Sequence, residues 1–249
     1  MRKSEDLQLG LPFRQWGGRR KGAGRKPSGP RTGVSHLARP NLAARFPVHV
    51  TLRLRDGIPS LRTGRMHAAL RGCLAEANAR AEEAGRGRVV HYSIMPNHLH
   101  LLWEARDREA LSRGVQGLAT RMARAVNRVA ERRGRVFGDR YHARILKTPR
   151  EVRLALTYVL SNARRHGLVR GRTSATWVDP YSSAAVFDGW RTKVTGPPFP
   201  LPLPKARTWL LAVGWRRYGL LDPAVAPGGS VRSRLSPSNC GTRRHRRRS

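Results

Sequence analysis

Two histidines stand one residue apart in the segment IMPNHLHLLWEA, which spans residues 94–105. Alternate residues of a β-strand face the same side, so His98 and His100 point together, about 7 Å apart at the backbone. Leu99 and Leu101 point to the opposite side, toward a core. Two neutral imidazoles at this spacing can reach one divalent cation. The alternative is that each histidine is satisfied by ordinary hydrogen bonds on a wet sheet face.

A tyrosine and an amide share one face of a helix further along the chain. In the segment TPREVRLALTYVLSNARRHG, residues 148–167, Tyr158 and Asn162 are four residues apart and therefore lie on the same face, which His166 continues. The apolar stripe that would form the core falls on other positions: Val152, Leu156, Val159, Leu160 and Ala163. Tyr158 is thus presented apart from the core stripe, with Asn162 one turn below it. A surface tyrosine with its hydroxyl in water is the alternative.

Strand and helix patterns alternate around these residues. Alternation of apolar and polar residues predicts strands, and recurrence every three or four residues predicts helices. In chain order they are a strand at 45–55, a helix at 60–84, strands at 89–95 and 98–105, a helix at 107–133, a strand at 140–146 and a helix at 148–167. This order is typical of an α+β fold, an antiparallel sheet with helices packed on one face, as in ferredoxin-like or RNA-recognition-like domains.

The chain is strongly basic, with a formal net charge of +35 over 249 residues. Residues 1–40 hold ten Lys/Arg against two acids, and residues 222–249 hold seven Arg against one. The excess that remains lies on the middle of the chain, so the globular part is basic as well. Such a surface attracts polyanions. Nucleic acid is the first candidate partner, because counterion release from phosphate favours binding, and an anionic membrane surface is the second.

The cysteines and the N-terminal segment bear on the compartment. Cys73 falls on an apolar helix face and Cys240 in a basic stretch, so neither suggests a disulfide framework. No apolar run is long enough to span a bilayer, and MRKSEDLQLG has no apolar signal region. We therefore expect a reducing, bacterial-type cytoplasm, with the protein associated with the nucleoid.

The motifs together resemble a known family. PNHLHLL, followed by VFGDRYHARIL and YVLSNARRHGLV, is similar to the single-tyrosine HUH transposases, and within them to the REP-associated tyrosine transposases, with the insertion-sequence-200-like transposases as wider kin. The resemblance runs from about residue 46 to residue 170. It implies an HUH nuclease domain at 41–190, followed by a helical extension at 191–221. The Gly-, Pro- and Arg-rich composition of the flanking segments predicts disordered basic tails at 1–40 and 222–249.

The resemblance also implies a role for each matching residue. His98, His100 and Asn162 would hold Mg²⁺ or Mn²⁺, and Tyr158 would be the nucleophile. Some relatives carry Gln where this chain has Asn162, so the shorter amide has to approach the metal more closely. The implied activity is metal-dependent cleavage and rejoining of single-stranded or hairpin DNA in transposition, through a 5′-phosphotyrosine intermediate. DNA is then the partner and a membrane is not, and a homodimer remains an option.

Two other functions fit the same residues. One is a non-catalytic, RNA-recognition-like module with structural histidines, and the other is a transposase that has lost catalysis and binds hairpin DNA. Two further features are open to two interpretations. Tyr92 and Trp103 either offer stacking surfaces for bases or belong to the core, and the arginine-rich face of the helix at 107–133 either follows phosphates or is only solvated. Three more histidines are candidates for proton transfer or for support of the site: His49, His91 and His142.

Overall fold

The computed structural model describes residues 39–84, 87–168, 174–196, 201 and 203–226. The predicted tails at 1–40 and 222–249 therefore lie almost wholly outside the described residues. Among the described residues, no helix is long and apolar enough to cross a membrane.

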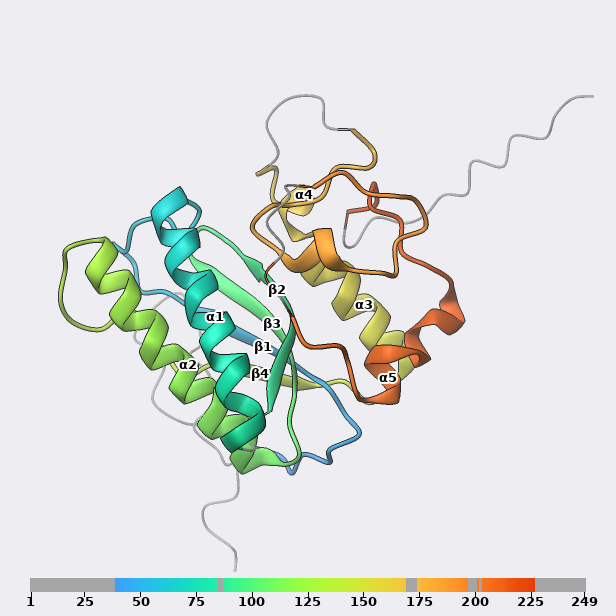
Figure 1. Cartoon of the computed structure of the whole chain (residues 1–249), viewed down its shortest axis with the longest axis horizontal. Helices are drawn as coiled ribbons and strands as arrows, with labels where there is room; N and C mark the ends of the chain where they lie inside the picture. Colours follow the sequence, from blue (N-terminus) through green and yellow to red (C-terminus); the bar gives the residue numbers. More distant parts are fainter. Residues whose placement is uncertain (1–38, 85–86, 169–173, 197–200, 202, 227–249) are drawn as a thin grey trace, which may run out of the picture. The chain divides into compact units, whose positions relative to one another are not determined.

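Four antiparallel strands form one sheet in the order β2-β3-β1-β4 (Figure 1). They are β1 (Val48–Arg53), β2 (Arg88–Ile94), β3 (His98–Glu104) and β4 (His142–Ile145). β2 and β3 form the predicted hairpin, closed by a hydrogen bond from the Met95 amide to the His98 carbonyl at 2.9 Å. β3 pairs with β2 on one side and with β1 on the other, so the strand that carries the histidines lies inside the sheet.

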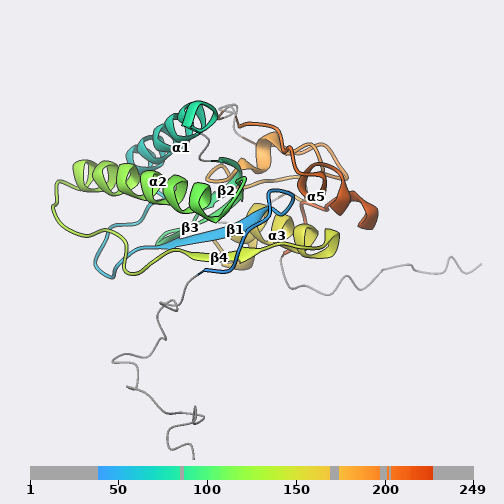
Figure 2. The ribbon, with the colours of Figure 1, turned by 90° about the horizontal axis from the view of Figure 1, so that it is seen from below.

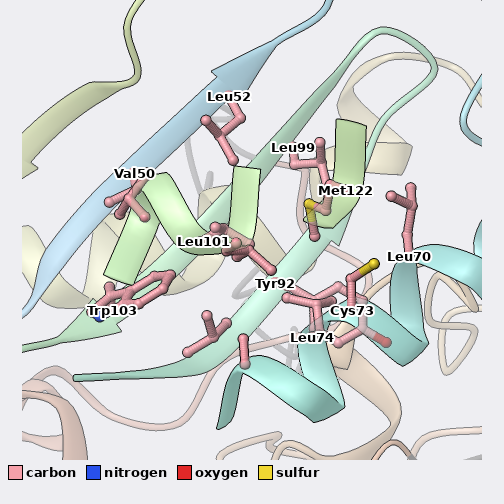
Figure 3. Packing of buried hydrophobic residues seen from close by; sticks show 14 of the residues in the cluster. Val50, Leu52, Leu70, Cys73, Leu74, Tyr92, Leu99, Leu101, Trp103 and Met122 are labelled. Carbon is pink, nitrogen blue, oxygen red and sulfur yellow. The ribbon is translucent and has the colours of Figure 1, made fainter. Parts of the chain in front are cut away.

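Two long helices cover one face of the sheet. They are α1 (Gly64–Ala84) and α2 (Arg108–Val129), and they lie side by side in both ribbon views (Figures 1 and 2). Asp107 caps α2, because its carboxylate accepts a hydrogen bond from the Ala110 amide. Leu99 and Leu101 point toward these helices, as Figure 3 shows. The main hydrophobic core thus lies on the face of β3 that its leucines occupy.

A third helix covers the opposite face of the sheet. The two long helices α1 and α2 share one face as expected, whereas this helix does not. This helix is α3 (Pro149–Leu160), and a short helix, α4 (Asn162–Arg165), follows it. Thr148 and Glu151 form the predicted capping box at its start. α3 packs on Val90, Leu102 and Leu146 in a second hydrophobic cluster. The α+β class and the antiparallel sheet are confirmed.

The C-terminal part of the chain completes the second cluster. It contains η1 (Ser183–Val186), α5 (Trp209–Ala212) and η2 (Gly214–Tyr218). Trp215 is fully buried against α3, which closes the side of the sheet where α3 lies. A buried ion pair joins this part to the first half of the chain, since Arg62 contacts both carboxylate oxygens of Asp179, at 2.8 and 2.7 Å.

Candidate active site

His98 and His100 lie on the face of β3 that α3 covers. Their ring centroids are 4.7 Å apart. His100 faces Thr51 across the β1–β3 pairing, and His98 faces Arg53. His100 is buried, with 4% of its surface exposed, whereas His98 is half-buried. The alternation of β3 therefore separates the two histidines from the leucine core as predicted.

The Nδ1 atoms of both histidines have partners. His100 Nδ1 lies 3.1 Å from Thr51 Oγ1 and 3.1 Å from His49 Nε2. His98 Nδ1 lies 2.8 Å from the Oδ1 atom of Asn97, which is an acceptor. In the tautomer with the proton on Nδ1, His98 donates to Asn97, His100 donates to either Thr51 or His49, and each ring keeps the lone pair of its Nε2. His100 Nε2 is buried and has no hydrogen-bond partner within the described part of the chain.

Burial keeps these imidazoles neutral near pH 7. It lowers the pKa of His100 to about 2, with His49 and His98 nearby adding to the effect. It lowers the pKa of His98 to about 4, helped by Arg53, and that of His49 to about 4, helped by His142. Neutral imidazole is the form that binds metal ions, and no proton has to leave before it does so at pH 7.

Tyr158 reaches the histidine pair from α3. Its ring centroid lies 4.9 Å from that of His100 and 5.8 Å from that of His49. The ring is half-buried, and the guanidinium of Arg165 lies 5.6 Å from its centroid. The predicted nucleophile and the predicted metal ligands, about sixty residues apart in the sequence, are therefore side by side.

Asn162 is fully buried, at 0% exposure, and stands at the start of α4. Neither its Oδ1 nor its Nδ2 has a hydrogen-bond partner among the described residues. Residues four apart share a helix face, and the residues four before and four after it, Tyr158 and His166, both lie against the histidine pair. The ring of His166 is 6.3 Å from that of His98. The single helix predicted at 148–167 is, however, interrupted at Ser161, because α3 ends at Leu160 and α4 begins at Asn162.

The other predicted residues lie in different surroundings. His91 packs edge-on against Phe187, with ring centroids 5.3 Å apart, and its Nδ1 is 3.3 Å from Ser183 Oγ, while His142 is exposed on β4. Of the two interpretations of Tyr92 and Trp103, the one that places them in the core is confirmed. Both are buried in the core beneath α1 and α2, because each pairs across the sheet with a residue on the leucine face.

The arginines near the site come from β1, β4 and α4 and not from α2. Arg53 and Arg144 are exposed on β1 and β4, close enough to lower the pKa of His98 and His49 respectively. The arginine-rich side of α2 is exposed, but it lies across the sheet from the histidines. The positive rim of the site is therefore made by Arg53, Arg144 and Arg165.

Two imidazoles and an amide are the groups at this site whose chemistry suits a divalent cation. In the part of the chain that the structure describes, no three His, Cys, Asp or Glu side chains form a metal-binding group. The expected set contains only two such side chains, and its third member is Asn162. A buried amide without a partner costs about 1–3 kcal/mol, and so does a buried ring nitrogen. Ligation by His100 Nε2 and Asn162 Oδ1 would remove that cost.

No protein-family model matches the chain, and no curated protein matches it significantly. Among solved structures it is similar to that of a REP-associated tyrosine transposase bound to a REP hairpin, with 15% sequence identity, a TM-score of 0.45 and coverage of 60% of this chain and 82% of that one. This likeness concerns the fold alone, so the function has to be argued from the site.

Proposed function

We propose that this chain is a single-tyrosine HUH transposase, which cleaves and rejoins single-stranded or hairpin DNA through a covalent bond to Tyr158. One observation carries the proposal. The Tyr158 ring lies 4.9 Å from the His100 ring, whose Nε2 is buried without a partner among the described residues. Tyr158 and His100 come from elements far apart in the sequence. A purely structural role for either residue would not require their rings to be in contact.

His98, His100 and Asn162 would hold Mg²⁺ or Mn²⁺. When bound, such an ion neutralises charge on the scissile phosphate as a Lewis acid. Mg²⁺ prefers oxygen ligands, whereas imidazole nitrogens bind Mn²⁺ more readily. Mn²⁺ therefore suits the histidine pair better. Thr51, His49 and Asn97 orient the two rings through Nδ1, in the way that outer hydrogen bonds orient metal-binding histidines.

Tyr158 supplies the nucleophile. Its phenol loses a proton to water, the phenolate oxygen forms a bond to phosphorus, and the bond from phosphorus to the 3′ oxygen breaks. The 3′ oxygen takes up a proton and leaves as a hydroxyl. The guanidinium of Arg165, 5.6 Å from the ring, places positive charge where the anionic phosphate would bind. Attack by a 3′-hydroxyl on the phosphotyrosine reverses these steps and joins a strand without ATP.

The experiment uses hairpin oligonucleotides with single-stranded flanks, incubated with the full chain and Mn²⁺ or Mg²⁺. A 5′-phosphotyrosine bond attaches the protein to the fragment that carries the 3′ end. A 3′ label should therefore appear as a slow adduct on a denaturing gel, and a 5′ label as a shortened strand. Tyr158→Phe should abolish both products. Tyr218→Phe is the matched control, since Tyr218 is 53% exposed on η2.

The roles of the metal ligands can be tested separately. His98→Ala should abolish cleavage while salt-sensitive binding of the hairpin stays close to that of the unaltered chain. An adduct that forms with Tyr158→Phe would exclude this tyrosine as the nucleophile. Binding without any adduct over a range of metals and hairpins would favour a DNA-binding protein without catalysis.

A further inference from the structure

A second site lies at the end of β3 away from His98. It is a pocket of about 540 Å³, lined by Arg45, Arg88, Glu104, Arg106, Arg207 and Trp209 among others. These residues come from the segment before β1, from the outer ends of β2 and β3, and from the segment that leads into α5. The volume falls within the range of about 300–1,000 Å³ that is usual for small-molecule sites.

The lining of the pocket favours an anion. Four of the lining residues are arginines and only one is acidic, and that one, Glu104, is buried and engaged in hydrogen bonds. Glu104 accepts from Arg88 Nε at 2.9 Å and from the Thr208 amide and hydroxyl at 2.8 Å each. The carboxylate thus fixes one arginine and the backbone beside Arg207. Arg106 pairs with Asp107 at 3.0 Å, and Arg45 adds a further positive charge to the lining.

Trp209 gives the pocket an aromatic wall. Its side chain is 50% exposed, although the neighbouring Leu210 and Leu211 are buried in the second cluster. The indole lies against the backbone at Gly214, where a Cβ atom would stand only 2.6 Å from the ring. The guanidinium of Arg217 is 4.9 Å from the ring centroid. Gly214 and Arg217 therefore hold the ring in place, while half of the side chain's surface stays exposed.

An aromatic surface beside several guanidinium groups is suited to a base and its phosphate. We propose that this pocket holds one unpaired nucleotide of the DNA strand that the active site cuts. Four residues of β3 separate His100 from Glu104, which is about 13 Å at the rise of a strand. The two places are therefore close enough for one DNA strand to reach both. The choice of a DNA strand as the ligand rests on the proposed function, but the site is separate from the histidines.

The test measures binding in the Tyr158→Phe chain, so that cleavage plays no part. The probe is a fluorescently labelled hairpin with single-stranded flanks, and a set of probes carries one abasic site at each flank position in turn. Trp209→Ala should weaken binding of the intact probe about 5- to 150-fold, the range found for loss of one base–aromatic stack. Removing the base at one flank position should weaken binding to the Tyr158→Phe chain by a similar factor. The same abasic probe should lose little further affinity for the chain that also carries Trp209→Ala.

Two matched controls accompany this cycle. Tyr218→Ala removes another exposed aromatic of the C-terminal part, and Arg113→Ala removes an exposed arginine of α2, across the sheet. Both should leave the effect of that abasic position unchanged. Effects of Trp209→Ala that simply add to the abasic effect at every position would overturn the proposal. A second result would also overturn it. If deoxynucleoside monophosphates at millimolar concentration quench Trp209 fluorescence, and no abasic position changes DNA binding, the site serves a free nucleotide.

The outcome is distinguishable from that of the proposed function. A coupled loss between Trp209 and one base, together with an unaltered chain that forms no adduct, would support the pocket and contradict the nuclease. An adduct that depends on Tyr158, with no such coupling at any position, would do the reverse.

Discussion

Replacing Asn162 with leucine should make the metal-free protein more stable and inactive. The side chain is fully buried and both its amide atoms lack partners among the described residues. A buried polar group in this condition costs about 1–3 kcal/mol. Leucine has a similar size and no polar atoms, so Asn162→Leu should raise the free energy of unfolding by about that amount. For a domain of this size each kcal/mol corresponds to about 2–4 °C in Tm.

The matched control is Asn78→Leu. The Asn78 amide donates to the Val89 carbonyl at 3.0 Å and accepts from the Val89 amide at 2.9 Å. Its replacement leaves two backbone groups unpaired, so it should lower the free energy of unfolding by about 1–3 kcal/mol. The two asparagine variants should therefore change stability in opposite directions in urea titrations with EDTA present.

Added Mn²⁺ should make the unaltered chain more stable to unfolding than its Asn162→Leu variant, which is the reverse of the order expected without metal. A ligand at 100 times its Kd stabilises a folded protein by about 2.7 kcal/mol, and the variant lacks one of the three expected metal-binding groups. Two results would refute the reasoning. One is an Asn162→Leu variant that loses stability like Asn78→Leu, which would mean that the amide is bonded. The other is equal stabilisation of both proteins by Mn²⁺, which would remove Asn162 from the ligands.

Three further predictions concern the rest of the fold and can be checked by urea or thermal unfolding. Glu104→Gln should lower the free energy of unfolding by about 3–5 kcal/mol, because it breaks a buried ion pair. Glu76→Gln, at an exposed pair, should lower it by less than about 1 kcal/mol. Similar losses in the two variants would contradict this. Burial lowers the pKa of His91 to about 4, so the stability it contributes is complete above pH 6.5 and declines as pH falls toward 4. His91→Gln should show a shallower decline between pH 7.5 and 5, and an equal slope would exclude this cause. Gly87→Ala should destabilise more than Gly134→Ala. Both have positive φ, but only at Gly87 would the new Cβ lie 2.3 Å from a carbonyl oxygen; equal losses would show that the backbone there can move.

Local patterns were enough to predict the order of the elements and the two motifs. The alternation in β3 placed His98 and His100 on one face, and the capping box at Thr148 marked the start of α3. These features depend on residues a few positions apart. The sequence also predicted that the Tyr158 face and the histidine pair act together, but only through the family resemblance.

Contacts between distant segments could not be predicted in this way. Thr51 and His49 support His100 because β1 pairs with β3 in one register, and no local pattern fixes that register. The same holds for Trp103, whose burial depends on the side of the sheet that α1 and α2 cover. Glu104 meets Thr208 across 104 positions, so the pocket has no trace in either segment alone.

The interior position of β3 has a consequence for the way the site opens. β3 is hydrogen-bonded to a neighbour along both edges, so its amides should exchange with solvent only when the sheet itself comes apart. Tyr158, by contrast, sits on a helix that side-chain packing attaches to that sheet. Under the proposed function, a DNA strand that enters or leaves the site would displace α3, while the two imidazoles on β3 stay in place. The turnover rate would then depend on how easily this one helix moves.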